Sequence, residues 1–156
     1  MIDATDRRIL ERLQTDARVS NADLARGLGM APSATLQRVR RLEERGVIEG
    51  YLARLDPRAV DRGLLAFVHL RTHEELPEST IPDEVARLPG VLEVHDIAGE
   101  DCYLVKVRVA DTDALHALVR RGIGGVDGVV STKTTIVMKT HAERFDLSLP
   151  ESEGER

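Results

Sequence analysis

The chain opens with three short segments in which apolar residues recur at helical spacing, residues 3–16, 20–29 and 32–45. Short polar residues stand where the first two segments begin, and such side chains accept hydrogen bonds from the free amides of a first helical turn. These caps are Asp3 or Thr5 and then Ser20-Asn21. The pattern predicts three amphipathic helices around one small core.

The third segment has two different sides. One side is small or apolar and is predicted to face the core: Thr35, Leu36, Val39 and Leu42. The other side is polar and basic: Ser33, Gln37, Arg38, Arg40 and Arg41. Two short helices joined by a glycine-containing turn are typical of a helix-turn-helix, whose second helix reads base edges with short polar groups and neutralises phosphates with arginines. The same spacing also fits an ordinary three-helix bundle with a solvated arginine face.

After a break at Asp56-Pro57, strand and helix patterns alternate. Strands are predicted at residues 64–72, 91–98, 102–109 and 126–139, and helices at 82–88 and 111–122. The order β-α-β-β-α-β is that of a ferredoxin-like α+β domain. Two helices cover only one face of such a sheet, so we expect a second copy of the chain to cover the other face.

Four regions follow from these patterns. We expect an N-terminal helix-turn-helix (winged-helix-like) domain, a hinge or linker strand, a ferredoxin-like domain through which copies of the chain assemble, and a C-terminal tail. Their residue ranges are 1–50, 51–62, 63–142 and 143–156, respectively. The tail begins with alternating apolar residues and ends in a polar stretch, so its first part is expected to pack on a neighbour.

Composition and charge narrow the class of protein. With 42% hydrophobic and 31% charged residues the chain is globular, and no apolar stretch approaches the roughly 20 residues that cross a bilayer. Its single cysteine, Cys102, excludes an intrachain disulfide framework. Residues 1–60 carry eleven arginines against nine acidic residues, whereas the remainder is acidic and brings the net charge to −5. We expect a cytoplasmic protein without a membrane segment, whose two halves have separate roles.

Catalytic and metal sites are not indicated by the sequence. Cys102 and His95 lie in neighbouring predicted strands, without a third group to orient them. The five histidines form no metal-binding motif, although His69 and His73 share one face of a predicted strand. The glycines of residues 122–125 follow a helix, whereas a phosphate-binding loop precedes one. We therefore expect no enzyme activity, no metal and no cofactor.

Three strings of residues occur in a fixed order within the first part of the chain. They are Asp6-x-x-Ile9-Leu10, Arg18-Val19-Ser20-Asn21-x-x-Leu24-Ala25 and Pro32-Ser33-x-x-x-x-Arg38-Val39-Arg40-Arg41-Leu42-Glu43-x-x-Gly46-Val47-Ile48-x-Gly50-Tyr51. Together they resemble the Lrp/AsnC family of feast/famine transcription regulators. The resemblance implies DNA-binding residues at the start of the second helix and on the third, the recognition helix: Ser20, Asn21, Ser33, Gln37, Arg38, Arg40 and Arg41. Thr35 stands where the family often has cysteine, and its inward position indicates a packing role.

The turn before the third predicted strand carries a second motif of this family, Gly99-Glu100-Asp101-Cys102-Tyr103-Leu104. The resemblance implies an amino-acid effector site here, for which Thr132, Thr134 and Thr135 offer hydroxyl groups and the turn offers backbone amides. The family frequently has an acid at the position of Cys102, so Asp101 or Glu100 is the candidate partner for the amino group of an effector. A polar hairpin turn and strand-favouring threonines explain the same residues without a ligand.

The resemblance also implies how such a regulator works. The second half is similar to the family's regulation-of-amino-acid-metabolism (RAM, ACT-like) domain, and the chain is expected to bind palindromic double-stranded promoter DNA as a dimer that joins into octamers or similar rings. An amino acid bound between dimers is expected to favour one assembly and so change the spacing of the recognition helices. The alternative is a DNA-architectural protein that wraps or bridges DNA without an effector.

Overall fold

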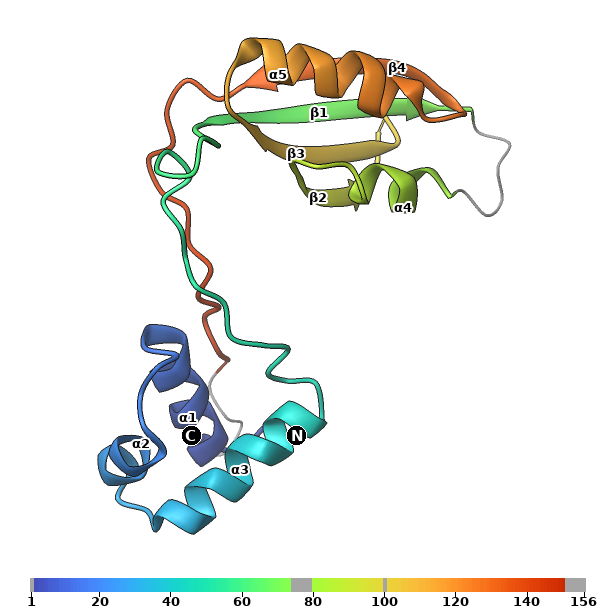
Figure 1. The fold of residues 1–156 in the computed structure, drawn as a ribbon. Helices are drawn as coiled ribbons and strands as arrows, with labels where there is room; N and C mark the ends of the chain where they lie inside the picture. The colour runs from blue at the N-terminus through green and yellow to red at the C-terminus, as the bar shows by residue number, and fades with distance from the viewer. Residues whose placement is uncertain (1, 74–79, 100, 151–156) are drawn as a thin grey trace. The chain divides into compact units, whose positions relative to one another are not determined.

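The computed structural model describes residues 2–73, 80–99 and 101–150, which fold as two compact units (Figure 1). The first unit comprises the chain up to Arg54 together with the part from Ala142 onward, and the second comprises Leu55–His141. The predicted combination of a helix-turn-helix unit and an α+β unit is confirmed. In the described part of the chain, no helix has the length and apolar character needed to cross a membrane.

Three helices build the first unit: α1 (Ala4–Thr15), α2 (Asn21–Leu28) and α3 (Pro32–Glu44). The side chains of Asp3 and Ser20 cap α1 and α2. Gly29 ends α2 with φ 67°, in the left-handed region where a residue without Cβ avoids strain. No side chain caps α3, which instead begins with Pro32, a residue that needs no amide partner.

The core of the first unit lies between the three helices. Its buried apolar residues are Ile9, Leu10, Leu24 and Leu42, and partly buried residues including Val39, Val47, Ile48 and Leu149 pack against them. Thr35 is also fully buried, and its Oγ1 donates to the Ala31 carbonyl at 3.2 Å, so its packing role is confirmed. The prediction that Leu36 faces the core is wrong, because its side chain is 39% exposed. Each helical residue turns by about 100°, which leaves Leu36 outside the stripe that contains Thr35.

The C-terminal tail, residues 142–150, packs within the first unit. Gln14 of α1 holds Leu147 by two hydrogen bonds: its Nε2 donates to the Leu147 carbonyl at 3.1 Å, and the Leu147 amide donates to its Oε1 at 2.6 Å. The guanidinium of Arg54 donates to the carbonyl of Glu143 at 3.2 Å. Residues 142–150 therefore belong to the same compact unit as the three helices.

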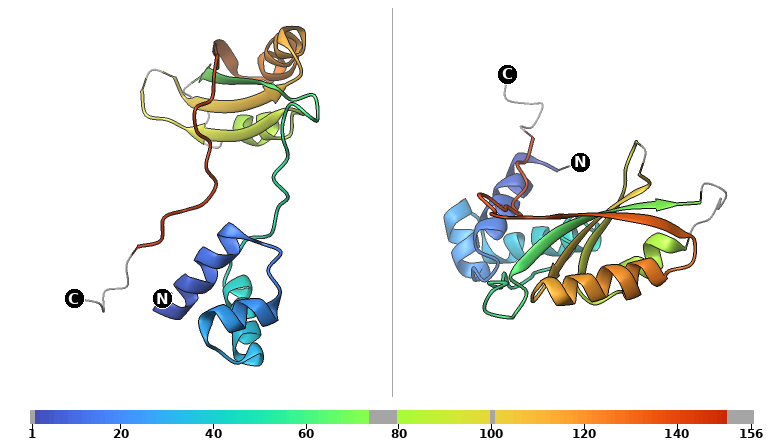
Figure 2. Two further views of the ribbon diagram at one scale, coloured as in Figure 1. Left: turned by 90° about the vertical axis from the view of Figure 1, so that its left-hand side faces the viewer. Right: turned by 90° about the horizontal axis from the view of Figure 1, so that it is seen from above.

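A four-stranded antiparallel sheet forms the second unit. Its strands are β1 (Leu64–Thr72), β2 (Val91–Asp96), β3 (Tyr103–Val109) and β4 (Val129–Ile136), in the order β2-β3-β1-β4. The helices are α4 (Ile81–Ala86) and α5 (Thr112–Ala117), which continues through a π-helical turn, Leu118–Gly122, and a 3-10 turn, Ile123–Gly125. Both helices lie on the same face of the sheet (Figures 1 and 2). This is the predicted order of a ferredoxin-like domain.

The register of the strands decides which side chains share a face of the sheet. One face packs beneath the helices, and its core residues include Ala66, Val68, Leu70, Val105 and Val107 together with Ile81, Val85, Leu115 and Ile123. Alternate residues such as Phe67, His69 and Lys106 lie on the other face. We call this second face the open face, because neither α4 nor α5 packs on it.

Candidate functional site

Ser20 and Asn21, both predicted to contact DNA, form hydrogen bonds within the chain at the start of α2. Ser20 Oγ accepts a hydrogen bond from the Asp23 amide at 3.1 Å and donates to Asp23 Oδ2 at 2.6 Å. Asn21 Nδ2 donates to the carbonyl of Pro32 at 2.9 Å, across the turn. Ser20 therefore caps α2, and Asn21 connects the start of α2 to the start of α3.

The α3 outer face consists of Ser33, Gln37, Arg40 and Arg41, all of them exposed. Their spacing of i, i+4, i+7 and i+8 places them along one side of the helix. Within the residues that the structure describes, none of these four side chains forms a hydrogen bond or an ion pair. Free guanidinium, amide and hydroxyl groups on one helical side are the groups that bind phosphates and base edges.

Leu36 borders the α3 outer face and was missed as a site residue. It lies three residues after Ser33 and four before Arg40, so the three side chains are neighbours on the helix. Its exposed fraction of 39% sets it apart from the buried core leucines. Because an apolar side chain on a recognition helix can contact the methyl group of thymine, Leu36 joins the candidate base-reading residues. By helical spacing, Leu36 lies at the edge of the apolar stripe, where spacing alone does not decide whether a side chain faces the core or the solvent.

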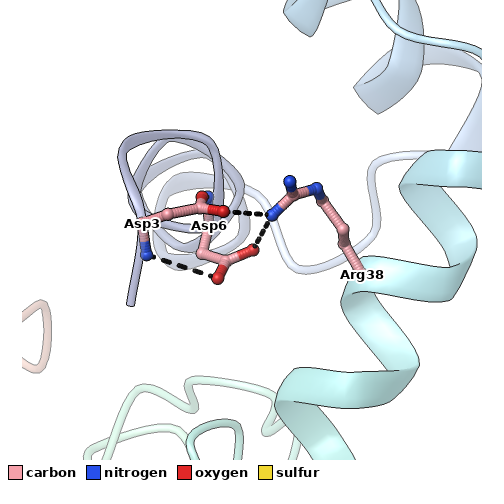
Figure 3. Close-up of polar contacts among 3 residues, drawn as sticks. All are labelled: Asp3, Asp6 and Arg38. Atoms are coloured by element: carbon pink, nitrogen blue, oxygen red, sulfur yellow. Dashed lines mark hydrogen bonds and ion pairs between the residues drawn. The ribbon is translucent and has the colours of Figure 1, made fainter. Parts of the chain in front are cut away.

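Arg38 differs from the other arginines of α3 because its side chain turns toward α1. Its Nη1 donates to Asp3 Oδ2 at 2.6 Å and to Asp6 Oδ1 at 2.7 Å (Figure 3). The hydrogen bonds to Asp3 and then Asp6 raise the pKa of Arg38, while the pKa of Asp3 is lowered first by the Asp6 amide and then by Arg38. The charge predicted to meet a phosphate therefore has two carboxylate partners within the chain.

The Gly99 turn, residues 97–102, connects β2 to β3 and contains most of the second predicted site. Gly99 has φ 143° and an exposed position. Asp101 Oδ2 lies 3.4 Å from Nδ1 of His69 on β1, without the alignment of a hydrogen bond. Glu100, the other predicted acid, lies outside the described residues. His69 was not predicted as a site residue, since only strand pairing brings β1 to this turn.

Tyr103 and Thr132 lie in one row across the sheet, on the face that the helices cover. Both pair with Leu70 of β1, Tyr103 from β3 and Thr132 from β4. Cys102, whose amide donates to the Leu70 carbonyl at 2.8 Å, connects this row to the Gly99 turn. The structure therefore brings the turn, Tyr103 and Thr132 to the same end of the sheet.

The other two predicted threonines lie farther along β4 and on opposite faces. Thr134 pairs with Val68 and shares the helix-covered face, whereas Thr135 pairs with Phe67 on the open face. Successive residues of a strand point to opposite sides of a sheet. One copy of the chain therefore does not bring Thr132, Thr134 and Thr135 into a single pocket.

His95, which was considered beside Cys102 for catalysis, belongs to a charged cluster on the open face. Its Nε2 lies 3.1 Å from Glu93 Oε2, and Lys106 Nζ donates to Glu93 Oε1 at 2.9 Å. Lys106 first and His95 second lower the pKa of Glu93. Across the described residues, no three His, Cys, Asp or Glu side chains are grouped so as to hold a metal ion.

Two family profiles match the two halves of the chain. The profile described as winged helix-turn-helix DNA-binding matches residues 2–49, which include α3. The profile described as Lrp/AsnC ligand binding domain matches residues 65–147, which include the Gly99 turn. The match to the second profile covers more than half of the chain, from the start of β1 into the C-terminal tail.

Proteins of known name and structure resemble the chain over nearly all of its length. The leucine-responsive regulatory protein of Escherichia coli K12 is 38% identical over 140 residues, covering 88% of this chain and 85% of that protein. The feast or famine regulatory protein from M. tuberculosis, complexed with L-methionine, is 35% identical with a TM-score of 0.87, and the match covers 94% and 99% of the two chains. A Neisseria meningitidis transcriptional regulator in complex with L-Met is 28% identical with a TM-score of 0.86, covering 95% and 97%.

Proposed function

Since this chain belongs to the Lrp/AsnC family of DNA-binding transcription regulators, we propose that its α3 outer face enters the major groove and that an amino acid at the Gly99 turn controls it. The proposal rests on two guanidinium groups, Arg40 and Arg41, which have no partner among the described residues and lie on the same side as Ser33 and Gln37. We further propose that the chain acts in the cytoplasm without catalytic activity, metal or cofactor.

The residues of this surface divide into two roles. Arg40 and Arg41 lie toward the end of α3 and bind phosphates, which fixes the helix on the duplex. Ser33 and Gln37 lie in its first half, where recognition helices contact base edges, and Leu36 beside them meets thymine methyl groups. Affinity therefore depends mainly on the arginines, and sequence preference on the other three residues.

A salt titration of DNA binding tests the phosphate contacts. Fluorescence anisotropy is measured on duplexes from the DNA upstream of the chain's own gene, at several salt concentrations. Arg41→Ala should lower affinity and reduce the slope of log affinity against log salt by about 0.9, the amount for one phosphate contact. Arg120→Ala, which removes an exposed arginine from the second unit, should leave the slope unchanged. If the wild-type protein binds no duplex even at low salt, the proposal is wrong.

Selection from a random duplex library tests the base contacts. Gln37→Ala should change the preferred bases at one position of the selected site, because a bidentate amide contact discriminates by about 1–3 kcal/mol. The same substitution should leave the salt slope as it is, since an amide releases no counterion. An unchanged preference would show that Gln37 does not read a base.

The effector that we propose is an amino acid at the end of the sheet formed by the Gly99 turn and Thr132. Amides of the turn bind its carboxylate, the Thr132 hydroxyl adds a bond, and the Asp101 carboxylate meets its ammonium group. Two similar structures contain L-methionine, which makes methionine the first compound to test.

A thermal-shift screen with the twenty amino acids tests this site. A ligand that binds only the folded protein adds about 2.7 kcal/mol at 100 times its dissociation constant. Thr132→Val, which keeps the shape and removes the hydroxyl, should reduce the shift. The absence of any shift at millimolar concentration would favour the effector-independent architectural alternative.

The assembly that we propose pairs two copies through their open faces and places two α3 helices on a palindromic site. Phe67, half-buried at the centre of this face, gives it an apolar contact. Dimers then join into octamers or similar rings, with the amino acid between dimers favouring one assembly. Phe67→Glu should yield monomers in sedimentation velocity, and a variant that remains dimeric would exclude the open face as the interface.

A further inference from the structure

Arg38 sits within the recognition helix, next to Gln37, yet contributes nothing to the α3 outer face. Its side chain is 32% exposed and its Nη1 is bonded to two carboxylates of α1, of which Asp6 is the more buried, with 11% of its side chain exposed (Figure 3). The contact joins residues 32 and 35 positions apart in the sequence. It is therefore a tertiary contact between the first helix and the recognition helix.

The two carboxylates that receive Arg38 are themselves fixed by the capping box of α1. Asp3 Oδ1 accepts from the Asp6 amide at 2.7 Å, and the Asp3 amide donates to Asp6 Oδ2 at 3.4 Å. Each carboxylate thus uses one oxygen for the cap and the other for Arg38. A guanidinium held by two fixed acceptors has little freedom to reach toward DNA.

The charges around Arg38 favour this arrangement over a phosphate contact. The two acids and the arginine carry opposite charge, and the acids also lie at the positive end of the α1 dipole. A phosphate would have to displace two short charge-assisted bonds in order to engage Arg38. Arg40 and Arg41 face no such competition in the described part of the chain.

We propose that Arg38 is a positioning residue that sets the orientation of α3 against the N-terminal end of α1, rather than a ligand of DNA. The inference rests on the proposed function, in which α3 enters the major groove. Gln37 and Arg41 flank Arg38 on the helix, so a rotation or tilt of α3 moves both a base-reading and a phosphate-binding group at once. Asp3 and Asp6, two acidic residues, then support DNA binding although their charge repels DNA.

Asp3→Asn separates the two roles because it keeps the cap while it removes one of the two carboxylates that hold Arg38. Asparagine caps a helix as well as aspartate does, but its amide nitrogen replaces the oxygen that accepts from Arg38. A positioning role predicts DNA binding about two- to fivefold weaker, the range for an exposed ion pair, with an unchanged salt slope. A phosphate-binding Arg38 would instead be held by Asp6 alone, and affinity would rise above that of the wild type. Glu11→Gln, which removes one exposed acid from the same helix, measures the general effect of charge.

Variants of Arg38 complete the experiment. Arg38→Ala should weaken binding without lowering the salt slope, and Arg38→Lys should restore part of the affinity, because a single nitrogen makes both bonds in the wild type. A salt slope reduced by about 0.9 in Arg38→Ala, as expected for Arg41→Ala, would overturn the inference. Circular dichroism melting checks that each variant is folded. Absence of DNA binding by the wild type would refute the proposed function instead, so the two failures are distinguishable.

Discussion

The recognition helix and the Gly99 turn show two different ways of assembling a site from one chain. On α3 the candidate residues follow helical spacing, and one regular helix decides which of them share a side. At the Gly99 turn the candidates come from the turn, β3 and β4, and strand register decides which share a face. The first kind of site is local in the sequence, whereas the second depends on pairing between distant segments.

In both regions, ionisable side chains contact one another beside the groups proposed to bind a ligand. Arg38 is held by Asp3 and Asp6 next to the α3 outer face, and His69 faces Asp101 at the Gly99 turn. In the first region the contact joins two helices, and in the second it joins a turn to a strand. On α3, the partners of Arg38 within the chain therefore distinguish it from Arg40 and Arg41.

The largest expected effect comes from removing a core leucine beneath either region. Leu42 and Leu70 are both fully buried, the first in the core of the helical unit and the second beneath the sheet. Each substitution to alanine should cost about 2–5 kcal/mol, because it leaves a cavity as well as losing burial. Leu42→Ala should destabilise the DNA-binding unit and weaken DNA binding, while the stabilisation by an amino acid persists.

Leu70→Ala is the matched control for that experiment. It should lower the melting temperature of the sheet unit and weaken the amino-acid response, because Leu70 pairs with both Tyr103 and Thr132. Differential scanning calorimetry with and without ligand measures both effects. If the two variants lowered the temperature of one common transition by the same amount, the two units would not unfold independently of each other.

We expect a smaller effect at Gly99, where a substitution would strain the backbone conformation. A Cβ at this position meets no atom of the described residues within 4 Å, so we expect Gly99→Ala to act through its φ of 143°. Holding a residue with a side chain in such a region costs about 1–3 kcal/mol. We expect a weaker thermal shift with amino acids and unchanged DNA affinity without them. Gly125→Ala, which has open space and an ordinary φ, should change neither quantity.

The helical unit could be predicted from the sequence in most respects because its determinants are local. Caps at Asp3 and Ser20, the stop at Gly29 and the buried Thr35 all follow from residue type and spacing, and the structure confirms them. Whether the side chain of Leu36 faces the core or the solvent could not be predicted, since this depends on how far the core extends around α3. The partners of Arg38 could not be predicted either, because they lie on another helix.

The order of helices and strands in the second unit could be predicted from the sequence. Which side chains become neighbours in the sheet could not. Alternation indicates that Thr134 and Thr135 point to opposite sides, yet only the register shows which of them lies beneath the helices. His69 reaches Asp101 through the same pairing. The return of the tail to Gln14 joins residues 133 positions apart, and no local pattern indicates such a contact.

Gln14 tests whether the recognition region depends on that distant segment. Gln14→Ala removes both hydrogen bonds to Leu147, each of which contributes about 0.5–1.5 kcal/mol. We expect faster cleavage by trypsin after Arg144 and a lower melting temperature of the helical unit. Gln37→Ala, at the other glutamine of the chain, should leave cleavage unchanged, because the Gln37 side chain is exposed and has no hydrogen-bond partner in the part of the chain that the structure describes. Equal cleavage rates in both variants would show that the tail is not held through Gln14.

The smallest expected effect is spectroscopic and uses the two tyrosines of the chain, one after each region. Tyr51 donates to Glu43 Oε1 at 2.9 Å, and burial first and this bond second raise its pKa from 10.0 to about 12. Because the folded value is the higher one, this contribution to stability is complete below pH 10 and is lost as the pH rises through 12. Phenolate absorbance of wild type and Tyr51→Phe assigns the titration. Glu43→Gln should lower the pKa of Tyr51, since the repulsion between carboxylate and phenolate disappears. Ionisation of Tyr51 near its ordinary value in the wild type would show that the end of α3 does not hold Tyr51 through Glu43.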